Sequence, residues 1–258
     1  MAKSLPNQAL QPIIDPLRGF ASAADLRRYR SDMKLAIIAE YDPSFEPHTH
    51  TDAAIAHSAS VLNLDVQSEW ISTAEADLTT LSAFNALWVA PGSPYRNLSR
   101  TLDAIRFARE HDVATLGTCG GYQHMVIEFA RNVAGIRDAQ HAEYDPYASC
   151  VIVSRLPCSL VGRELEIALT PGSRTAAAYG THSVTERYYC NFGVNPDFVA
   201  QIASAGFEVV GRDADGDCRV MEISQHRFFV GTLFVPQARS RPDRPHPLIT
   251  AFLLAAAR

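Results

Sequence analysis

The sequence predicts an α/β fold in which helices cover both faces of a parallel sheet. Buried-strand patterns and amphipathic helix patterns alternate from Met33 to about residue 148, as expected for consecutive strand–helix–strand units. Gly-rich turns follow two of those strands, at Gly92 and at residues 117–121. The chain has 258 residues, of which 47% are apolar and 20% charged, and this composition suffices for a sizeable core.

The elements of this first part follow from their hydrophobic periodicity. Residues 34–41 (KLAIIAEY) form a continuous apolar run that is typical of a buried strand. We expect a helix at residues 51–62, opened by a Thr51–Asp52 cap. Further strands are expected at residues 66–71, 86–92 and 113–119, and an amphipathic helix at 98–111.

The C-terminal half has a different pattern. Short apolar segments separated by Gly and Asp turns indicate an added β-rich region, which a final helix at residues 247–257 follows. The expected strands are residues 150–155, 164–169, 207–213, 218–224 and 227–235. We predict an N-terminal extension at residues 1–32, which bears prolines and arginines but no clear strand, and a single domain at residues 33–258.

Composition excludes several classes of partner. The formal net charge is −5 and no run of Lys or Arg stands out, so we expect no nucleic-acid partner. No apolar stretch approaches the roughly 20 residues of a membrane span, and the N-terminus has no apolar signal segment. The five cysteines are odd in number and lack C-x-x-C spacing, which favours a reduced, cytoplasmic chain without structural zinc. We expect no cofactor and no metal.

One segment carries the chemistry. An apolar strand pattern ends at Gly117–Thr118, Cys119 follows, and apolar residues at helical spacing begin after Gly120–Gly121. A thiol at a helix N-terminus has a lowered pKa because the helix dipole favours the thiolate. This arrangement predicts a nucleophilic Cys119. The alternative is a buried structural cysteine at a Gly-rich turn.

The same segment resembles the class I (triad) glutamine amidotransferases, and specifically the glutaminase domain of CTP synthase. Their G-x-C-x-G-x-Q turn is matched by Gly117, Cys119, Gly121 and Gln123, and AEYDP (142–146) resembles S-x-E-F-x-P, with Glu143 on the glutamine-binding Glu. ERYYCNFGVN (186–195) and VGTLFVPQARSRPDRPHPL (230–248) resemble two later motifs. The resemblance implies a flavodoxin-like three-layer fold with a mostly parallel central sheet and added β-strands in the C-terminal half.

The chain departs from this family at its catalytic base. The family's His and Glu of F-H-P-E are replaced here by Val235 and Gln237, and two of its arginines by Tyr189 and Asn191. The resemblance therefore implies a retained nucleophile without its usual dyad. It places Gly92, Gln123, Tyr189 and Asn191 around the substrate. About 33 residues precede the first strand, so CTP synthesis by this chain alone is not expected.

Other groups could serve the thiol. The backbone N–H groups of Ser93 and Gly120 are predicted oxyanion donors. His141, two residues before Glu143, is the predicted replacement base, with a histidine of the His48/His50 loop as the second choice. His-x-His-x-Asp is also a metal-like spacing, although a polar loop before the next helix is favoured.

Two functions remain open after these observations. The first is a Cys-dependent hydrolase or transferase that acts on a small-molecule amide or carbonyl other than glutamine, with Cys119, His141 and Glu143 as catalytic residues. The second is a degenerate domain that binds a small ligand or a partner protein without turnover. A homo-oligomer or a separate partner enzyme is compatible with either.

Overall fold

The computed structural model describes residues 32–258. The predicted N-terminal extension therefore lies outside the described residues, except for Asp32, where β1 begins. The strands are β1 (Asp32–Ile38), β2 (Asp65–Ile71), β3 (Ala86–Val89), β4 (Ala114–Thr118), β5 (Gln140–His141), β6 (Val151–Arg155), β7 (Glu164–Leu169), β8 (Ser183–Arg187), β9 (Phe192–Val194), β10 (Glu208–Asp213), β11 (Cys218–Glu222) and β12 (Phe229–Thr232).

The helices fall between these strands. Three short helices, α3, α6 and α7, were not predicted, and two of them, α6 and α7, lie in the half that reads as β-rich. The helices are α2 (Glu46–Leu62), α3 (Leu78–Leu81), α4 (Leu98–Glu110), α5 (Gly120–Asn132), α6 (Arg174–Tyr179), α7 (Pro196–Ser204) and α8 (Pro247–Ala256), with a 3-10 turn, η2, at Pro236–Arg239.

One nine-stranded sheet organises the molecule, in the order β2-β1-β3-β4-β12-β11-β10-β7-β8. Its first five strands pair in parallel, and the remaining pairs are antiparallel. The α/β fold is confirmed, but the sheet is mixed rather than mostly parallel. Of the expected β-rich segments, β7, β10, β11 and β12 join this sheet, whereas β6 does not. A small sheet, β5-β6-β9, lies apart.

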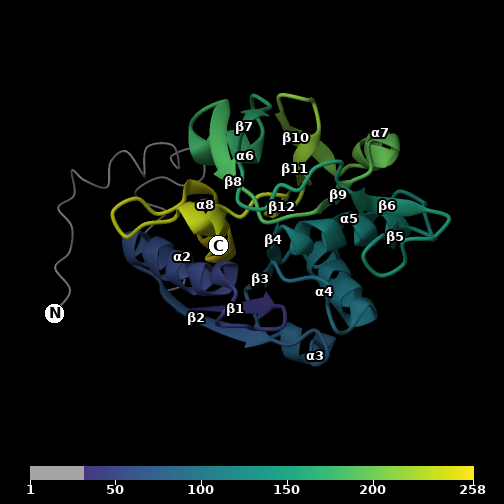
Figure 1. Ribbon diagram of the computed structural model, residues 1–258. Coiled ribbons are helices and arrows are strands. Elements are labelled where there is room, and N and C mark those ends of the chain that lie inside the picture. The colour runs from purple at the N-terminus through teal and green to yellow at the C-terminus, as the bar shows by residue number, and fades with distance from the viewer. Residues whose placement is uncertain (1–31) are drawn as a thin grey trace.

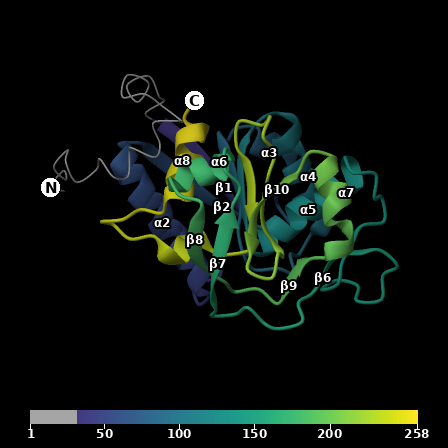
Figure 2. The ribbon, with the colours of Figure 1, turned by 90° about the horizontal axis from the view of Figure 1, so that it is seen from above.

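Helices cover both faces of the sheet, so the fold has three layers (Figures 1 and 2). Helices α2, α6 and α8 pack on one face, and α4, α5 and α7 pack on the other. Helix α8 is buried along nearly its whole length, as expected for a helix that is apolar all round. Strands β3, β4 and β12 are completely buried, and β1 is buried from Leu35 onward, which explains their continuous apolar sequences.

The start of α2 corrects one prediction. The helix begins at Glu46, with Pro47 in its first turn, and not at a Thr51–Asp52 cap. Proline fits the first turn of a helix because its missing N–H has no partner there anyway. His48 and His50 are therefore helical residues and do not belong to a loop.

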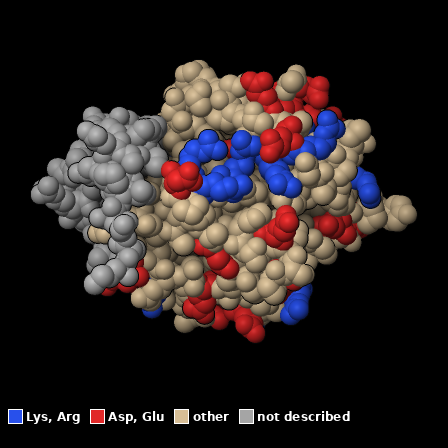
Figure 3. All heavy atoms as spheres, turned by 60° about the vertical axis from the view of Figure 1, so that its left-hand side comes forward, with Lys and Arg blue, Asp and Glu red and all other residues tan. Residues whose placement is uncertain are grey.

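Basic side chains are clustered on one face of the surface although they are scattered in the sequence. Lys and Arg side chains form a band across the face seen in Figure 3, with acidic side chains among and below them. Basic residues that form no run in the sequence thus gather in space. Within the described residues, no helix is both long enough and apolar enough to cross a membrane.

Candidate active site around Cys119

Cys119 occupies the sharp turn between β4 and α5. Its backbone has φ 51° and ψ −111°, a conformation that residues other than glycine rarely adopt. Its N–H donates to the carbonyl of Thr232, at 2.8 Å. Backbone strain of this kind persists only where the surroundings fix it, and it often accompanies function.

Two glycines make the turn possible because helix α5 lies directly against the sheet. A Cβ on Gly121 would be 1.9 Å from the carbonyl oxygen of Val89, in the adjacent strand β3. A Cβ on Gly117 would be 2.2 Å from the sulfur of Met125. Any side chain at either glycine would push the helix away from the strands and move Cys119.

The two predicted oxyanion donors lie side by side. A Cβ on Gly120 would be only 3.2 Å from the backbone nitrogen of Ser93. Gly92, with φ 114°, lets the preceding loop turn toward Cys119. The end of β3 and the start of α5 thus bring Ser93 and Gly120 together, as the sequence predicted.

Glu143 joins this group through Ser93. The Ser93 hydroxyl donates a hydrogen bond to the Glu143 carboxylate, but burial outweighs this bond and raises the pKa of Glu143. The second carboxylate oxygen, Oε2, is buried without a hydrogen-bond partner among the described residues. A buried acceptor of this kind is available to a donor group on a ligand.

A chain of hydrogen bonds fixes both loops. The Tyr95 N–H donates to the hydroxyl of Tyr144 at 2.7 Å, and that hydroxyl donates to Nε2 of His124 at 2.9 Å. The Nδ1–H of His124 then donates to the carbonyl of Gly120 at 2.7 Å. His124 therefore holds the nucleophile turn in place, and burial lowers its pKa to about 4.

Both ring nitrogens of His141, the predicted replacement base, are engaged in hydrogen bonds. Its Nδ1 accepts a hydrogen bond from the backbone N–H of Glu143 at 3.0 Å, and its Nε2–H donates to Oε1 of Gln123 at 3.0 Å. The chain turns after His141 instead of continuing as a strand, so His141 and Glu143 do not lie along one extended segment. Burial lowers the pKa of His141 to about 3.

Both polar atoms of the Gln123 side chain are also engaged in hydrogen bonds. While Oε1 of its side chain accepts from His141, Nε2 donates to the carbonyl of Phe192 at 2.8 Å. This predicted substrate-binding residue is 2% exposed, and its amide links α5 to β9. Its substrate-binding role stays a prediction, whereas the structure gives it a bracing role.

The two degenerate dyad positions are both buried. Val235 is fully buried. Gln237 donates through Nε2 to Thr51 Oγ1 at 3.0 Å, and the same atom lies 3.5 Å from Thr118 Oγ1, next to Cys119 in the chain. The Oε1 atom of Gln237 is buried without a described partner. The family's acid position is thus filled by a neutral amide that ties η2 to α2.

The remaining predicted substrate-binding residues, Tyr189 and Asn191, flank Cys190 in the chain. The Tyr189 hydroxyl donates to Glu46 at 3.1 Å, and its ring packs edge-on against Phe45, with ring centres 6.5 Å apart. Asn191 is exposed. Neither side chain is shown to bind a ligand, so their substrate-binding roles stay predictions.

His48 supports the loop that carries Gly92. Its Nδ1 accepts from the Asp42 N–H at 2.9 Å, and its Nε2–H donates to the Pro91 carbonyl at 2.8 Å. Both nitrogens are therefore occupied. The metal-like spacing does not form a metal site either: Asp52 accepts from the Trp70 indole at 2.7 Å, and residues 32–258 contain no group of three or more potential metal ligands.

The cysteines correct a further prediction. Cys119 and Cys190 form a disulfide pair, with their sulfurs in contact and their Cα atoms 6.1 Å apart. The expectation of five reduced thiols is therefore wrong for two of them, while Cys150, Cys158 and Cys218 are free. The cysteine count and spacing gave no sign of this pair, because its two members are 71 residues apart in the sequence. This pairing also weakens the basis on which a cytoplasmic location was predicted.

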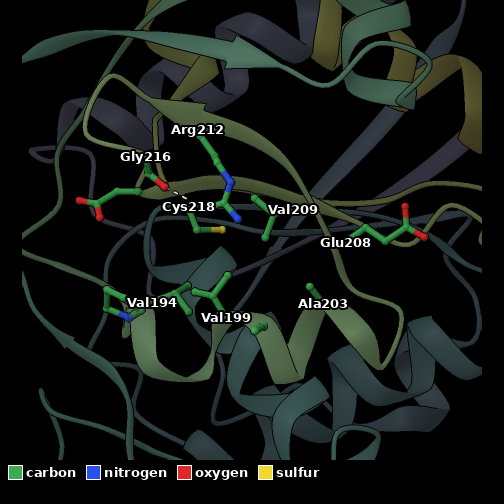
Figure 4. A pocket seen from close by; sticks show the side chains of 11 residues that line it. Val194, Val199, Ala203, Glu208, Val209, Arg212, Gly216 and Cys218 are labelled. Carbon is green, nitrogen blue, oxygen red and sulfur yellow. Dashed lines mark hydrogen bonds between the residues drawn. The ribbon is translucent and has the colours of Figure 1, made fainter.

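A separate hollow lies away from this chemistry. It has a volume of about 420 Å³ between α7 and the β10–β11 hairpin, and Cys119 does not line it. Figure 4 shows Arg212 and Gly216 on one side and Val199 and Ala203 on the other. Arg212 donates to the Gly216 carbonyl at 2.7 Å. Cys218, at its edge, is a buried thiol whose pKa burial raises to about 11.

The fold and the thiol turn together match those of a known enzyme class. A family model described as "Glutamine amidotransferase class-I" matches residues 48–255. The chain therefore belongs to the class I glutamine amidotransferase family.

Within that family, the chain is similar to CTP synthases. It is 32% identical to CTP synthase of Encephalitozoon cuniculi over 238 residues, which are 89% of this chain and 44% of that protein. It is 35% identical to CTP synthase of Leifsonia xyli over 216 residues, which are 78% of this chain and 38% of that protein. The chain thus spans less than half the length of these relatives.

Solved structures agree on the fold. The glutaminase domain of Trypanosoma brucei CTP synthase with bound acivicin superposes with a TM-score of 0.81 at 21% identity, and the match covers 87% of this chain and 94% of that domain. A glutamine amidotransferase from Methylobacillus flagellatus gives a TM-score of 0.54 at 12% identity, covering 88% and 92%. At these identities the likeness concerns the fold alone.

The sequence did not identify Cys190 as a residue of the candidate site. Cys190 lies in the ERYYCNFGVN segment (186–195), which was recognised as family-like. Its position within a segment that resembles a glutamine-binding motif was the available signal. A cysteine in such a segment is expected to lie near the nucleophile in space, although the two are far apart in the sequence.

Proposed function

We propose that this protein is a Cys119-dependent acyltransferase or hydrolase that acts on the carbonyl group of a small molecule other than glutamine. The observation that carries the proposal is the turn at Cys119, where a strained nucleophile position lies at the N-terminus of α5. A helix N-terminus stabilises a thiolate. A thiolate needs no base to attack a carbonyl carbon.

The neighbouring groups support the same chemistry. The attack of Cys119 on a carbonyl would create an oxyanion, for which the N–H groups of Ser93 and Gly120 are candidate donors. One such donor typically contributes about 10²–10³ in rate. Glu143, with its unpaired Oε2, is a candidate acceptor for a donor group on the substrate. Tyr189 and Asn191 remain candidate contacts at the rim.

The histidines restrict the substrate. His141 and His124 have both ring nitrogens in hydrogen bonds, and their lowered pKa values make them weak bases at neutral pH. Departure of an amine from an amide requires a proton donor, whereas a thiolate or phenolate leaves without one. The arrangement therefore favours activated carbonyl substrates such as thioesters over ordinary amides.

An acyl probe tests the proposal. We expect protein reduced with dithiothreitol and then desalted to release p-nitrophenolate from p-nitrophenyl acetate, with an acetyl group on Cys119 in the peptide mass map. Cys119→Ser should lose both signals, while Cys158→Ser, which changes an exposed cysteine, should keep them. Equal release by Cys119→Ser and the unmodified chain would overturn the proposal.

The second candidate function is ligand or partner binding without turnover. It is favoured by Gln237, which fills the family's acid position with a neutral hydrogen-bonded side chain. If no acyl group forms on reduced Cys119 while the fold is intact, this binding function becomes the better account. In either case a separate enzyme or a second copy of the chain is a candidate partner.

A further inference from the structure

The pairing of Cys119 with Cys190 serves no step of acyl transfer. A disulfide removes the sulfur lone pair and charge with which Cys119 would attack a carbonyl. The two cysteines come from different parts of the fold: Cys119 lies between β4 and α5, and Cys190 lies between β8 and β9. Their Cα separation of 6.1 Å falls within the range of natural disulfides, about 4.4–6.8 Å.

We propose that Cys119 and Cys190 form a redox-active dithiol, which a hydroperoxide oxidises to the disulfide and a dithiol reductant restores. This inference does not depend on the acyl-transfer function, because it requires only the two sulfurs and their surroundings. It assigns the chain a second chemistry at the same turn.

The two sulfurs have unequal roles. Cys119 begins α5, a helix of 13 residues, and the helix dipole favours its thiolate. In the reduced form the Cys190 thiol has a hydrogen-bond acceptor, because its sulfur lies 3.1 Å from the Leu233 carbonyl oxygen. Cys119 is therefore the attacking sulfur, and Cys190 is the resolving one.

The reaction balances in two steps. The Cys119 thiolate attacks one oxygen of the hydroperoxide; an S–O bond forms, the O–O bond breaks, and the leaving oxygen takes a proton to become an alcohol, or water when the oxidant is hydrogen peroxide. The Cys190 thiol then loses its proton and attacks the Cys119 sulfur. An S–S bond forms, the S–O bond breaks, and water leaves. The hydroperoxide gains the two electrons that the thiols lose.

Burial restricts which oxidant reaches the pair. Cys119 is 8% exposed and Cys190 is 2% exposed, so a compact hydroperoxide has access where a folded protein disulfide does not. The other cysteines lie elsewhere: Cys158 is exposed and Cys218 is buried under Tyr122, whose hydroxyl lies 3.2 Å from its sulfur. Cys119 and Cys190 are thus the two sulfurs placed to react with each other.

Thiol counting on the full chain tests the proposal. Protein reduced with dithiothreitol and desalted should contain five thiols. One equivalent of hydrogen peroxide should lower the count to three, and peptide mapping after alkylation should show residue 119 joined to residue 190. Dithiothreitol under native conditions should restore the count to five.

Variants separate the two roles. In Cys190→Ser, peroxide should leave Cys119 as a sulfenic acid that dimedone traps, and no disulfide should form. In Cys119→Ser, no thiol at residue 190 should be lost at the same peroxide dose. Cys158→Ser serves as the matched control, and it should form the 119–190 pair at the unmodified rate.

Three results would overturn the proposal. Peroxide could leave all five thiols in place, or the lost thiols could map to Cys150, Cys158 or Cys218. Alternatively, the pair could resist dithiothreitol until the protein is unfolded, which would make it a static structural disulfide. These measurements use the unmodified chain, so they stand even if a variant fails to fold. Failure of ester cleavage would leave them unchanged.

Discussion

The imidazole Nε2 of His141 lies 3.0 Å from the amide oxygen Oε1 of Gln123. Because the second nitrogen of His141 accepts from the backbone of Glu143, the ring connects the nucleophile helix to the segment that carries Glu143. A histidine used in this way must stay neutral, since the protonated ring could not accept the Glu143 N–H. The neutral form of His141 therefore stabilises the link between these two segments.

Acid should destabilise the protein through its buried histidines. Burial lowers the pKa of His141 to about 3 and that of His124 to about 4, whereas an unfolded chain has a histidine pKa of about 6.5. Between these values the unfolded state binds protons that the folded state does not. The free energy of unfolding should therefore fall as pH drops below about 6.5, with a slope of up to about 1.4 kcal/mol per pH unit for each histidine.

Urea unfolding at several pH values between 7.5 and 4.5 measures this slope. His141→Asn keeps an acceptor for the Glu143 N–H but has no titrating ring, so its slope should be shallower. His182→Asn, at an exposed position, is the matched control and should leave the slope unchanged. A slope identical in His141→Asn and the unmodified chain would show that His141 does not titrate as argued.

Gln237→Glu should destabilise the fold more at high pH than at low pH. Gln237 is 1% exposed, and its amide donates to Thr51. A glutamate there would lose that donor and bury a carboxylate, whose folded pKa would rise above its unfolded value. Stability would then be lost as pH rises, by about 1–3 kcal/mol or more for an unsatisfied buried group.

Unfolding of Gln237→Glu at pH 5 and pH 8 measures the effect, with Gln237→Met as a control that introduces no charge. The difference between Gln237→Glu and Gln237→Met should widen toward pH 8. If both variants show the same loss at both pH values, the carboxylate is not buried and the packing described for η2 is wrong.

The sequence predicted the order of the elements well because their burial is so uneven. Strands such as β1 and β3 are buried on both faces and read as continuous apolar runs. Short elements carry little periodicity, which is why α6, with six residues, and β9, with three, were missed. The start of α2 was misplaced because its first turn, Glu-Pro-His-Thr-His, looks polar although Pro47 and His48 are buried.

The backbone positions of the site were predictable from the order of the strands, but the side-chain contacts were not. Cys119, Ser93 and Gly120 follow strands that end at the same edge of the sheet, so topology alone brings them together. Side-chain partners, in contrast, depend on rotamers and on loops that close over long sequence distances. Neither the bond between His141 and Gln123 nor the pairing with Cys190, 71 residues from Cys119, could be deduced from spacing.

Gly121→Ala should destabilise the fold severely. An added Cβ would lie 1.9 Å from the Val89 carbonyl oxygen, which belongs to backbone and cannot swing aside. Overpacking in a core typically costs about 1–3 kcal/mol, and a backbone clash can cost more. Thermal unfolding of the two proteins measures the loss.

Gly162→Ala provides the comparison. This residue has φ 76° and nothing within 4 Å of an added Cβ, so only the left-handed backbone opposes the change, at about 1–2 kcal/mol. Gly121→Ala should therefore melt well below Gly162→Ala. The reverse order would contradict the close contact of α5 with β3.

Glutamine hydrolysis should be very weak or absent, even in the fully reduced protein. Val235 is buried and carries no titratable group, and Gln237 is a neutral amide that donates a hydrogen bond to Thr51. Neither position can therefore accept or donate a proton as the family's base and acid do. General acid–base catalysis typically contributes about 10²–10⁴ in rate. Ammonia release from glutamine should be followed after dithiothreitol treatment, which frees Cys119 from Cys190, with Cys119→Ser as the background. Release at the rates common for enzymes, about 1–10³ s⁻¹, would show that another group has replaced the dyad and would return His141 to consideration as the base.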